Sequence, residues 1–198
     1  MNSRGQQTVT FGAGRLTIED VVAVAKGAPA ALSADAAFRR RIDLGVAFLE
    51  RLLREDGVVY GVTTGYGESC TVAIPRHLVD ELPLHLTRFH GCGLGADLEP
   101  DQVRAVLATR LCSLAVGYSG VRFVLLERLV ELLQRDVLPR IPQEGSVGAS
   151  GDLTPLSYVA AALVGEREVH CGGRIRPTAE VYAELGIQPL ALKPKEGL

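Results

Sequence analysis

The 198-residue sequence has little net charge and no long apolar run, and each shortage excludes a class of protein. The formal net charge of −2 provides no general electrostatic field for nucleic acid or an anionic membrane. No apolar run approaches the roughly 18 residues that a transmembrane helix needs, and the polar start lacks the apolar core of a signal peptide. We therefore expect a soluble, cytoplasmic protein that binds neither nucleic acid nor membrane.

Cysteine and histidine are scarce, and their spacing is not that of a metal site. Cys70, Cys92, Cys112 and Cys171 form no CxxC pair, and the four histidines form no HExxH motif. In a cytosolic chain this usage predicts buried free thiols rather than disulfides or zinc ligands. We expect no bound metal.

The sequence is rich in apolar residues arranged with helical periodicity. Apolar residues make up 47% and charged residues 22% of the chain, which is typical of a folded globular protein. Capping residues, prolines and glycines at the ends of apolar stripes predict helices over 17–26, from Ser33 to Gly57, over 75–90, from Pro100, over 121–135, after Asp152 and from Thr178 to Gly186.

Only one stretch is typical of sheet. It is EVHCGGRIRP, in which Gly172 and Gly173 predict a two-residue hairpin turn. Pro139 and Pro142 interrupt the pattern ahead of it. We therefore predict a mainly α fold with helices long enough to form a bundle and with one small β-hairpin.

Residues 145–155, GSVGASGDLTP, place the smallest side chains at the entrance to an apolar helix. A phosphate loop is excluded, because the segment has no lysine and its glycines fit neither GxxxxGK[ST] nor GxGxxG. A nucleophile elbow is a weak alternative, because its G-x-S-x-G pattern is not met. Taken alone, Ala149-Ser150-Gly151 is best interpreted as a loop that leads to a helix cap at Asp152.

Three further motifs accompany this segment. They are YGVTTGYGES at 60–69, TRLCSLAVG at 109–117 and LKPKEGL at 192–198. Together with GSVGASGDLTPLS they resemble the aromatic amino-acid ammonia-lyases and aminomutases, a family that includes the histidine, phenylalanine and tyrosine ammonia-lyases. The resemblance implies that residues 1–198 form the N-terminal part of such an enzyme: a helical domain and the start of a long helical bundle, without the family's C-terminal bundle.

The resemblance implies that Ala149, Ser150 and Gly151 cyclise into a 4-methylidene-imidazol-5-one prosthetic group. The Gly151 amide nitrogen must attack the Ala149 carbonyl, which calls for a residue without Cβ, and Ser150 loses its hydroxyl to become the methylidene. This group is the electrophile to which the substrate's amine adds. Neither a metal nor a dissociable cofactor is implied.

By the same resemblance, Tyr60 is the catalytic base and Gly67 binds substrate. The glycines between residues 61 and 67 predict a loop able to close over the site. A tyrosine is a weak base in water, so the site must stabilise its anion with cationic or dipolar neighbours. Standing alone, Tyr60 would be interpreted as a half-buried aromatic residue of a strand.

Phe89 and His90 fall where the family has its substrate-selecting pair. His90 suits a hydrogen bond to an imidazole or a phenol, which favours histidine or tyrosine over phenylalanine as the substrate. The alternative is a core histidine on the stripe of Leu78 and Leu86. The implied reaction is the elimination of ammonia to give an α,β-unsaturated arylacrylate.

Two other functions stay open at this point. One is an aminomutase that forms a β-amino acid, and the other is a catalytically incomplete, lyase-derived module that only binds partners. The family's carboxylate- and amine-binding positions lie beyond this sequence, so we expect the isolated chain to cyclise poorly and not to anchor substrate. It would act with the remainder of a lyase chain or with a second polypeptide, in a homotetramer.

Overall fold

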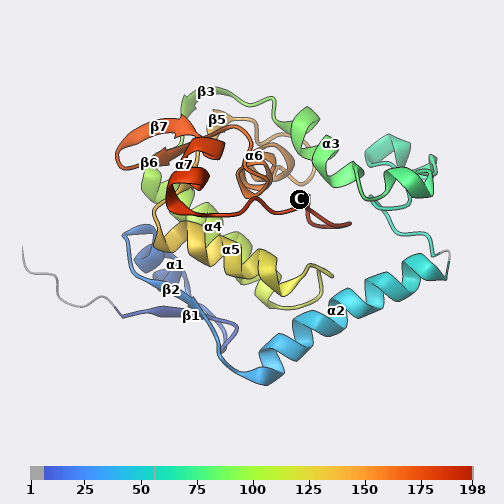
Figure 1. The fold of residues 1–198 in the computed structure, drawn as a ribbon, viewed down its shortest axis with the longest axis horizontal. Coiled ribbons are helices and arrows are strands. Elements are labelled where there is room, and N and C mark those ends of the chain that lie inside the picture. The colour runs from blue at the N-terminus through green and yellow to red at the C-terminus, as the bar shows by residue number, and fades with distance from the viewer. Residues whose placement is uncertain (1–6, 56, 198) are drawn as a thin grey trace, which may run out of the picture.

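The computed structural model describes residues 7–55 and 57–197, and helices dominate this part of the chain (Figure 1). The prediction of a mainly α fold is confirmed. The described residues form seven α-helices: α1 (Ile18–Ala25), α2 (Ala36–Arg54), α3 (Leu82–His90), α4 (Pro100–Ala115), α5 (Phe123–Gln134), α6 (Leu153–Leu163) and α7 (Thr178–Leu185).

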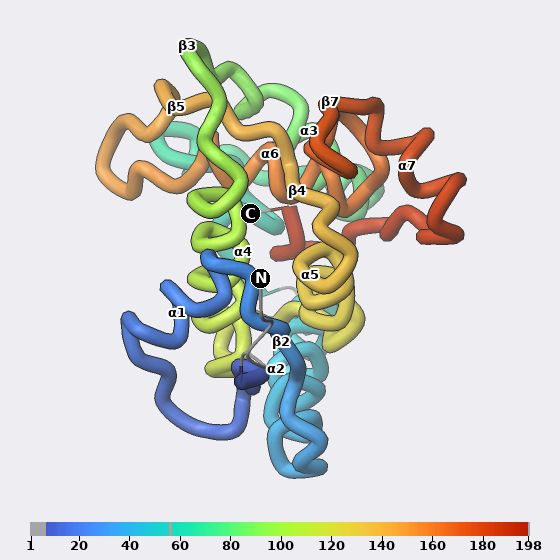
Figure 2. Tube along the Cα trace, turned by 90° about the vertical axis from the view of Figure 1, so that its left-hand side faces the viewer, coloured from blue at the N-terminus to red at the C-terminus, as the bar shows by residue number. Residues whose placement is uncertain are grey.

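Helix α4 lies at the centre of the core, with α1 on one side and α5 on the other (Figure 2). Its buried positions recur at the helical spacing of three and four residues, as in Leu107, Leu111 and Leu114. Burying a leucine side chain contributes about 1.5–3 kcal/mol, so this stripe is a main source of stability. Helix α6 is buried along most of its length and packs on α3, which agrees with its nearly all-round apolar sequence.

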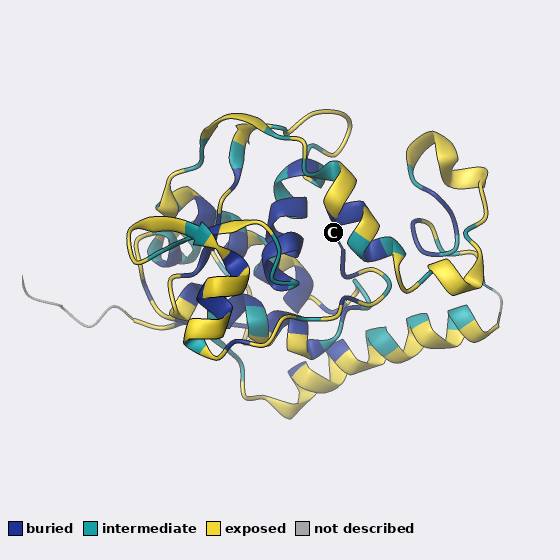
Figure 3. Cartoon of the chain, turned by 45° about the horizontal axis from the view of Figure 1, so that its top comes forward, coloured by how far each residue is buried: buried dark blue, intermediate teal, exposed yellow. Residues whose placement is uncertain are grey.

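Helix α2 extends away from this core as an arm (Figure 1). Of its predicted apolar stripe, Phe38 and Ile42 are buried, whereas the later positions are only partly covered (Figure 3). The expected cap at Ser33 was wrong. The N-cap is Asp35, whose carboxylate accepts a hydrogen bond from the Ala37 amide at 2.8 Å, while the Ser33 hydroxyl accepts one from the Asp35 amide.

The ends of the other helices can be compared with the capping residues expected from the sequence. Thr17 and Asp20 form the expected capping box at the start of α1, and α7 ends where Gly186 adopts a left-handed φ of 67°. The predicted helix over 75–90 is shorter, because a 3-10 turn at Arg76–Leu78 precedes α3 and Pro83 lies in the first turn of α3. Asp152 occupies the N-cap position of α6, but its side chain makes no capping bond.

The predicted hairpin is confirmed as β6 (Glu168–Cys171) and β7 (Arg174–Pro177), with positive φ at both turn glycines. The sequence did not predict the other strands. They are β4 (Leu138–Pro139) beside β6, β1 (Val9–Phe11) parallel to β2 (Ala30–Leu32), and β3 (Leu94–Asp97) with β5 (Pro142–Glu144). Each has two to four residues, too few for an alternation to be visible. Pro139 and Pro142 lie within strands because edge strands tolerate proline.

The cysteines are free, as expected, but the prediction that they are buried was wrong. Cys70 and Cys92 are exposed, and Cys112 and Cys171 are half-buried. Within 7–55 and 57–197, no three His, Cys, Asp or Glu side chains gather where they could hold a metal ion. None of the helices described is long and apolar enough to cross a membrane.

Candidate active site

Two glycine-rich segments that are far apart in the sequence line one cavity. Its volume is about 610 Å³, which falls in the range of small-molecule sites. Tyr60 and Gly67 come from the first segment, and Ala149 and Ser150 from the second. The remaining lining residues are Gly61, Tyr66, Pro83, Leu86, Arg110, Tyr118, Ser119, Leu153, Lys195 and Gly197.

The segment before α6 turns sharply at its glycines. Gly148 and Gly151 have φ of +82° and +73°, a left-handed backbone that favours glycine. A Cβ on Gly151 would come within 2.9 Å of the Ser146 hydroxyl oxygen. Between the two glycines, Ala149 and Ser150 are exposed at the cavity. These features fit the cyclisation implied by the family resemblance, which requires an unhindered amide at position 151 and an accessible serine.

Helix α6 begins directly after this segment. The amide end of a helix carries a partial positive charge, which stabilises negative charge that develops near it. Leu153, the first residue of the helix, also lines the cavity. The tripeptide therefore lies at the positive end of a buried helix.

Tyr60 lies in a turn, not in a strand, and its side chain is 55% exposed. Its hydroxyl accepts a hydrogen bond from the Gly67 amide at 2.9 Å. Within the same loop, the Gly61 amide donates to the Thr64 hydroxyl and the Val59 amide donates to the Thr63 hydroxyl. Side-chain hydroxyls thus hold this loop in place.

Tyr66 is the second aromatic residue of the loop. Its ring meets the Tyr60 ring edge to face, with the centroids 6.1 Å apart. Burial, with a smaller contribution from the neighbouring Tyr60, raises the pKa of Tyr66 to about 12. Tyr66 therefore keeps its proton at neutral pH, and its hydroxyl donates to the Gly61 carbonyl at 2.9 Å.

Two cationic residues complete the lining, and the sequence analysis did not single them out. Arg110 comes from the middle of α4; burial lowers the pKa of its guanidinium, and the Asp152 carboxylate opposes that shift. Lys195 lies in the segment that runs back toward α3 near the C-terminus (Figure 1) and has a left-handed φ of 73°. Both lie in motifs that the sequence showed, TRLCSLAVG and LKPKEGL, but only the fold places them at the cavity.

The segment that carries Lys195 is anchored by a buried carboxylate. Glu196 is 3% exposed, and its oxygens accept hydrogen bonds from two guanidinium nitrogens of Arg122, at 2.6 and 2.9 Å. They also accept from the backbone amides of Arg122 and Lys193. On the next residue, a Cβ at Gly197 would come within 2.8 Å of the Pro83 carbonyl oxygen. This wall of the cavity is therefore tightly packed.

Residues 16–198 of this chain match the family of aromatic amino acid lyases. The chain belongs to this family. It is 45% identical over 184 residues to the histidine ammonia-lyase of Gloeobacter violaceus, an alignment that covers 92% of this chain and 35% of that protein. It is 43% identical over 192 residues to a tyrosine 2,3-aminomutase of Streptomyces globisporus, named as MIO-dependent, with 97% of this chain and 34% of that protein covered.

A solved structure shares the fold of this lyase-family chain. The ergothioneine-degrading enzyme ergothionase of Treponema denticola superposes with a TM-score of 0.90 at 28% identity, covering 96% of this chain and 38% of that one. The chain therefore spans about a third of the length of the relatives it matches.

Phe89 and His90, which the resemblance implies to be the substrate-selecting pair, do not line the cavity. The Phe89 side chain is 59% exposed, and the His90 Nδ1 atom lies 3.1 Å from the Leu86 carbonyl oxygen, one helical turn back. His90 is connected to the cavity only through Tyr66, which lines it: the centroids of the two rings lie 6.5 Å apart. Their role in substrate choice stays a prediction that the described residues do not support by direct contact.

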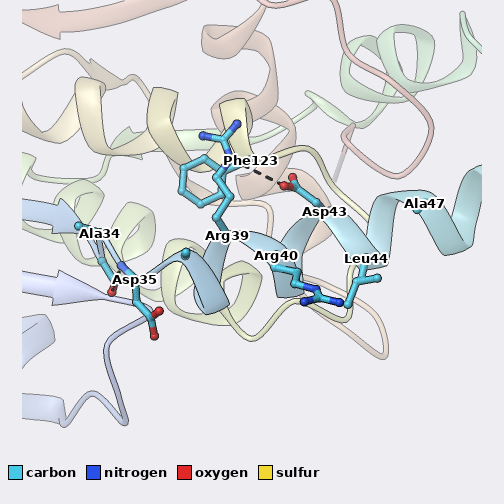
Figure 4. A pocket seen from close by; sticks show the side chains of 10 residues that line it. Ala34, Asp35, Arg39, Arg40, Asp43, Leu44, Ala47 and Phe123 are labelled. Carbon is cyan, nitrogen blue, oxygen red and sulfur yellow. Dashed lines mark hydrogen bonds and ion pairs between the residues drawn. The ribbon is translucent and has the colours of Figure 1, made fainter.

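A hollow of similar size lies on α2 but lacks the groups of this site. Its volume is about 660 Å³, and Figure 4 shows the side chains that line it. Arg39 pairs with Asp43 across 3.8 Å and also covers the Phe123 ring, so its charge is already engaged. Neither glycine-rich segment reaches it. We therefore take the cavity at Tyr60 and Ser150 as the candidate active site.

Proposed function

We propose that the protein to which this chain contributes eliminates ammonia from an aromatic L-amino acid, histidine or tyrosine, and releases an α,β-unsaturated arylacrylate. The observation that carries the proposal is that Tyr60, Ala149 and Ser150 line one cavity. Because the chain spans about a third of its relatives, the active protein includes the remainder of a lyase chain or a second polypeptide. It assembles as a homotetramer, as the family resemblance implies.

The electrophile of the reaction is a 4-methylidene-imidazol-5-one formed from Ala149, Ser150 and Gly151, which activates the amine of the substrate as a leaving group. The left-handed backbone at Gly151 and the exposed Ser150 support this assignment. The Streptomyces globisporus relative is named as dependent on MIO, the abbreviation for the methylidene-imidazolone group, and this name supports the assignment as well.

The chain's own residues then have distinct tasks. Tyr60, as its phenolate, takes the proton beside the aromatic ring of the substrate and becomes neutral, and the Gly67 amide that donates to its oxygen stabilises the phenolate before the transfer. Pro83, Leu86 and Leu153 form the apolar lining against the substrate. Arg110 and Lys195 provide positive charge in the same cavity, which attracts the carboxylate of the amino acid.

An aminomutase is the second candidate. It uses the same electrophile and returns ammonia to the β-carbon, and the 43% identity to a tyrosine 2,3-aminomutase favours it. NMR analysis of the products separates the two functions, because an arylacrylate contains an alkene and a β-amino acid does not. A protein that binds partners but turns over no aromatic amino acid would be a lyase-derived module.

Intact-mass spectrometry of the assembled protein tests the proposed function. Loss of two water molecules during cyclisation lowers the mass by about 36 Da, and Ser150→Ala should abolish this change together with turnover. Ser119→Ala is the matched control, because Ser119 lines the same cavity outside the tripeptide; it should keep the lowered mass. A full, uncyclised mass in the freshly purified wild-type assembly would refute the proposal.

A further inference from the structure

Two tyrosines of the 57–67 loop are tied to each other's neighbouring glycine. The Tyr60 hydroxyl accepts from the amide of Gly67, the residue after Tyr66. The Tyr66 hydroxyl donates to the carbonyl of Gly61, the residue after Tyr60. Both distances are 2.9 Å. We call this reciprocal pair of bonds the tyrosine clasp.

The Tyr66 ring lies directly against the backbone that carries Tyr60. A Cβ on Gly61 would come within 2.5 Å of the Cε1 atom of Tyr66, so the two make a close contact that only glycine allows. Gly61 and Gly67 also have φ of +68° and +55°, so the loop turns at both ends of the clasp. The geometry of the loop therefore depends on the ring of Tyr66 as well as on its hydroxyl.

The environments of the two tyrosines give them different roles. Tyr66 is half-buried, between the rings of Tyr60 and His90. With a pKa of about 12 it stays protonated and remains a hydrogen-bond donor. Tyr60 is mostly exposed at the cavity and uses its oxygen as the acceptor in the clasp, which leaves its own proton free to point elsewhere.

We propose that Tyr66 is the positioning residue for Tyr60: it holds the Gly61 backbone so that the Tyr60 hydroxyl stays on the Gly67 amide and faces the cavity. This inference rests on the proposed function, in which Tyr60 is the base. It also gives the Gly67 amide a role that the sequence did not predict. That amide orients the base through the clasp, whereas the family resemblance assigned Gly67 to substrate binding.

Tyr66→Phe tests the clasp because it removes one hydroxyl and keeps the ring. Hydrogen–deuterium exchange over residues 59–70, measured by mass spectrometry, should become faster, since one of the two closing bonds is lost. This measurement needs no activity. Tyr158→Phe is the matched control: it removes another hydroxyl that accepts from a glycine amide, that of Gly93 at 3.0 Å, outside the cavity. It should leave exchange over 59–70 unchanged.

Kinetics in the assembled enzyme distinguish positioning from substrate contact. Tyr66→Phe should lower kcat about tenfold with KM nearly constant. A misplaced base stabilises the transition state less but leaves substrate binding unchanged. The lowered mass of the cyclised tripeptide should persist. Tyr66→Leu, which also removes the ring, should lower kcat further, and the phenylalanine variant should be the better of the two.

Two results would overturn the inference. Wild-type exchange over 59–70 in Tyr66→Phe would show that its hydroxyl does not hold the loop. A raised KM with unchanged kcat would make Tyr66 a substrate contact instead. An uncyclised wild-type enzyme would refute the proposed function by a separate measurement, and the exchange comparison would still decide whether the clasp holds the loop.

Discussion

The two glycine-rich segments that line the cavity differ in what they present to it. In the 57–67 loop, the hydroxyls of Thr63, Thr64 and Tyr66 bind backbone atoms and hold a side chain, Tyr60, in place. In the 145–151 segment, glycines with left-handed backbone leave Ala149 and Ser150 exposed. The difference teaches that, under the proposed function, one segment orients a side chain, whereas the other presents its own backbone for covalent change.

Gly151→Ala should have the largest effect. Position 151 combines a positive φ with a close neighbour, Ser146, so a methyl group there strains the backbone and hinders the amide that must cyclise. We expect loss of the mass change of about 36 Da and a fall in kcat of at least about 10³-fold. Intact mass and steady-state kinetics measure both.

Gly172→Ala is the control for backbone strain alone. Gly172 has a similar positive φ of +60° in the hairpin turn, with open space around it. It should cost stability of about 1–2 kcal/mol and leave cyclisation intact. If Gly151→Ala cyclises as well as the wild type, the contrast between the two segments fails.

Tyr60→Phe should have the next largest effect, and it should impair the role of the 57–67 loop without impairing that of the 145–151 segment. The tripeptide should still cyclise, because the change lies in the other segment, while kcat falls by about 10²–10⁴-fold through loss of the base. Mass spectrometry and kinetics on one preparation give both results. Wild-type kcat would exclude Tyr60 as the base.

Glu196→Gln should have a smaller effect than these changes at the two segments, and we expect it on stability. Residues 193–197 resemble the 57–67 loop in that side-chain bonds fix their backbone. Hydrogen bonds to a buried charge contribute about 1.5–3 kcal/mol, and the partial exposure of Arg122 reduces this. We therefore expect a loss of about 1–2 kcal/mol in urea unfolding.

Glu184→Gln is the matched change at the surface. The Glu184 carboxylate pairs with Arg176 at 2.6 Å but is 60% exposed, so its loss should cost at most about 1 kcal/mol. Equal effects at positions 184 and 196 would mean that burial of Glu196 does not anchor the cavity wall.

Local signals predicted much of the helical fold. The capping box at Thr17, the proline at the start of α4 and the stop at Gly186 act within one turn of the chain, so neighbouring residues suffice to specify them. The predictions that failed depend on distant residues. Asp35 replaces Ser33 as the cap of α2 at the point where β2 ends and the arm leaves the core.

The sequence predicted the chemical roles of several candidate site residues but not which residues line the cavity. The motif around Ala149, Ser150 and Gly151 and the motif around Tyr60 carried the resemblance that implies a cyclised tripeptide and a tyrosine base. Arg110 lies in a motif but was not singled out as a site residue, and Phe89 and His90, whose role in substrate choice stays a prediction, do not line the cavity. Which face of a helix meets a cavity depends on packing between helices, here α3 against α6, and on no local pattern.

By itself, the sequence determined where the backbone turns and where most helices start and stop, and it contained the residue types that the family resemblance associates with a cyclising tripeptide. These properties follow from φ preferences, capping bonds and residue chemistry, which act over a few residues. Only the tertiary structure decided that Tyr60 and Ser150 line one cavity, that Lys195, beside the anchored Glu196, lines it as well, and that Tyr66 rather than His90 borders it. Those contacts join segments that only the burial of the common core brings together.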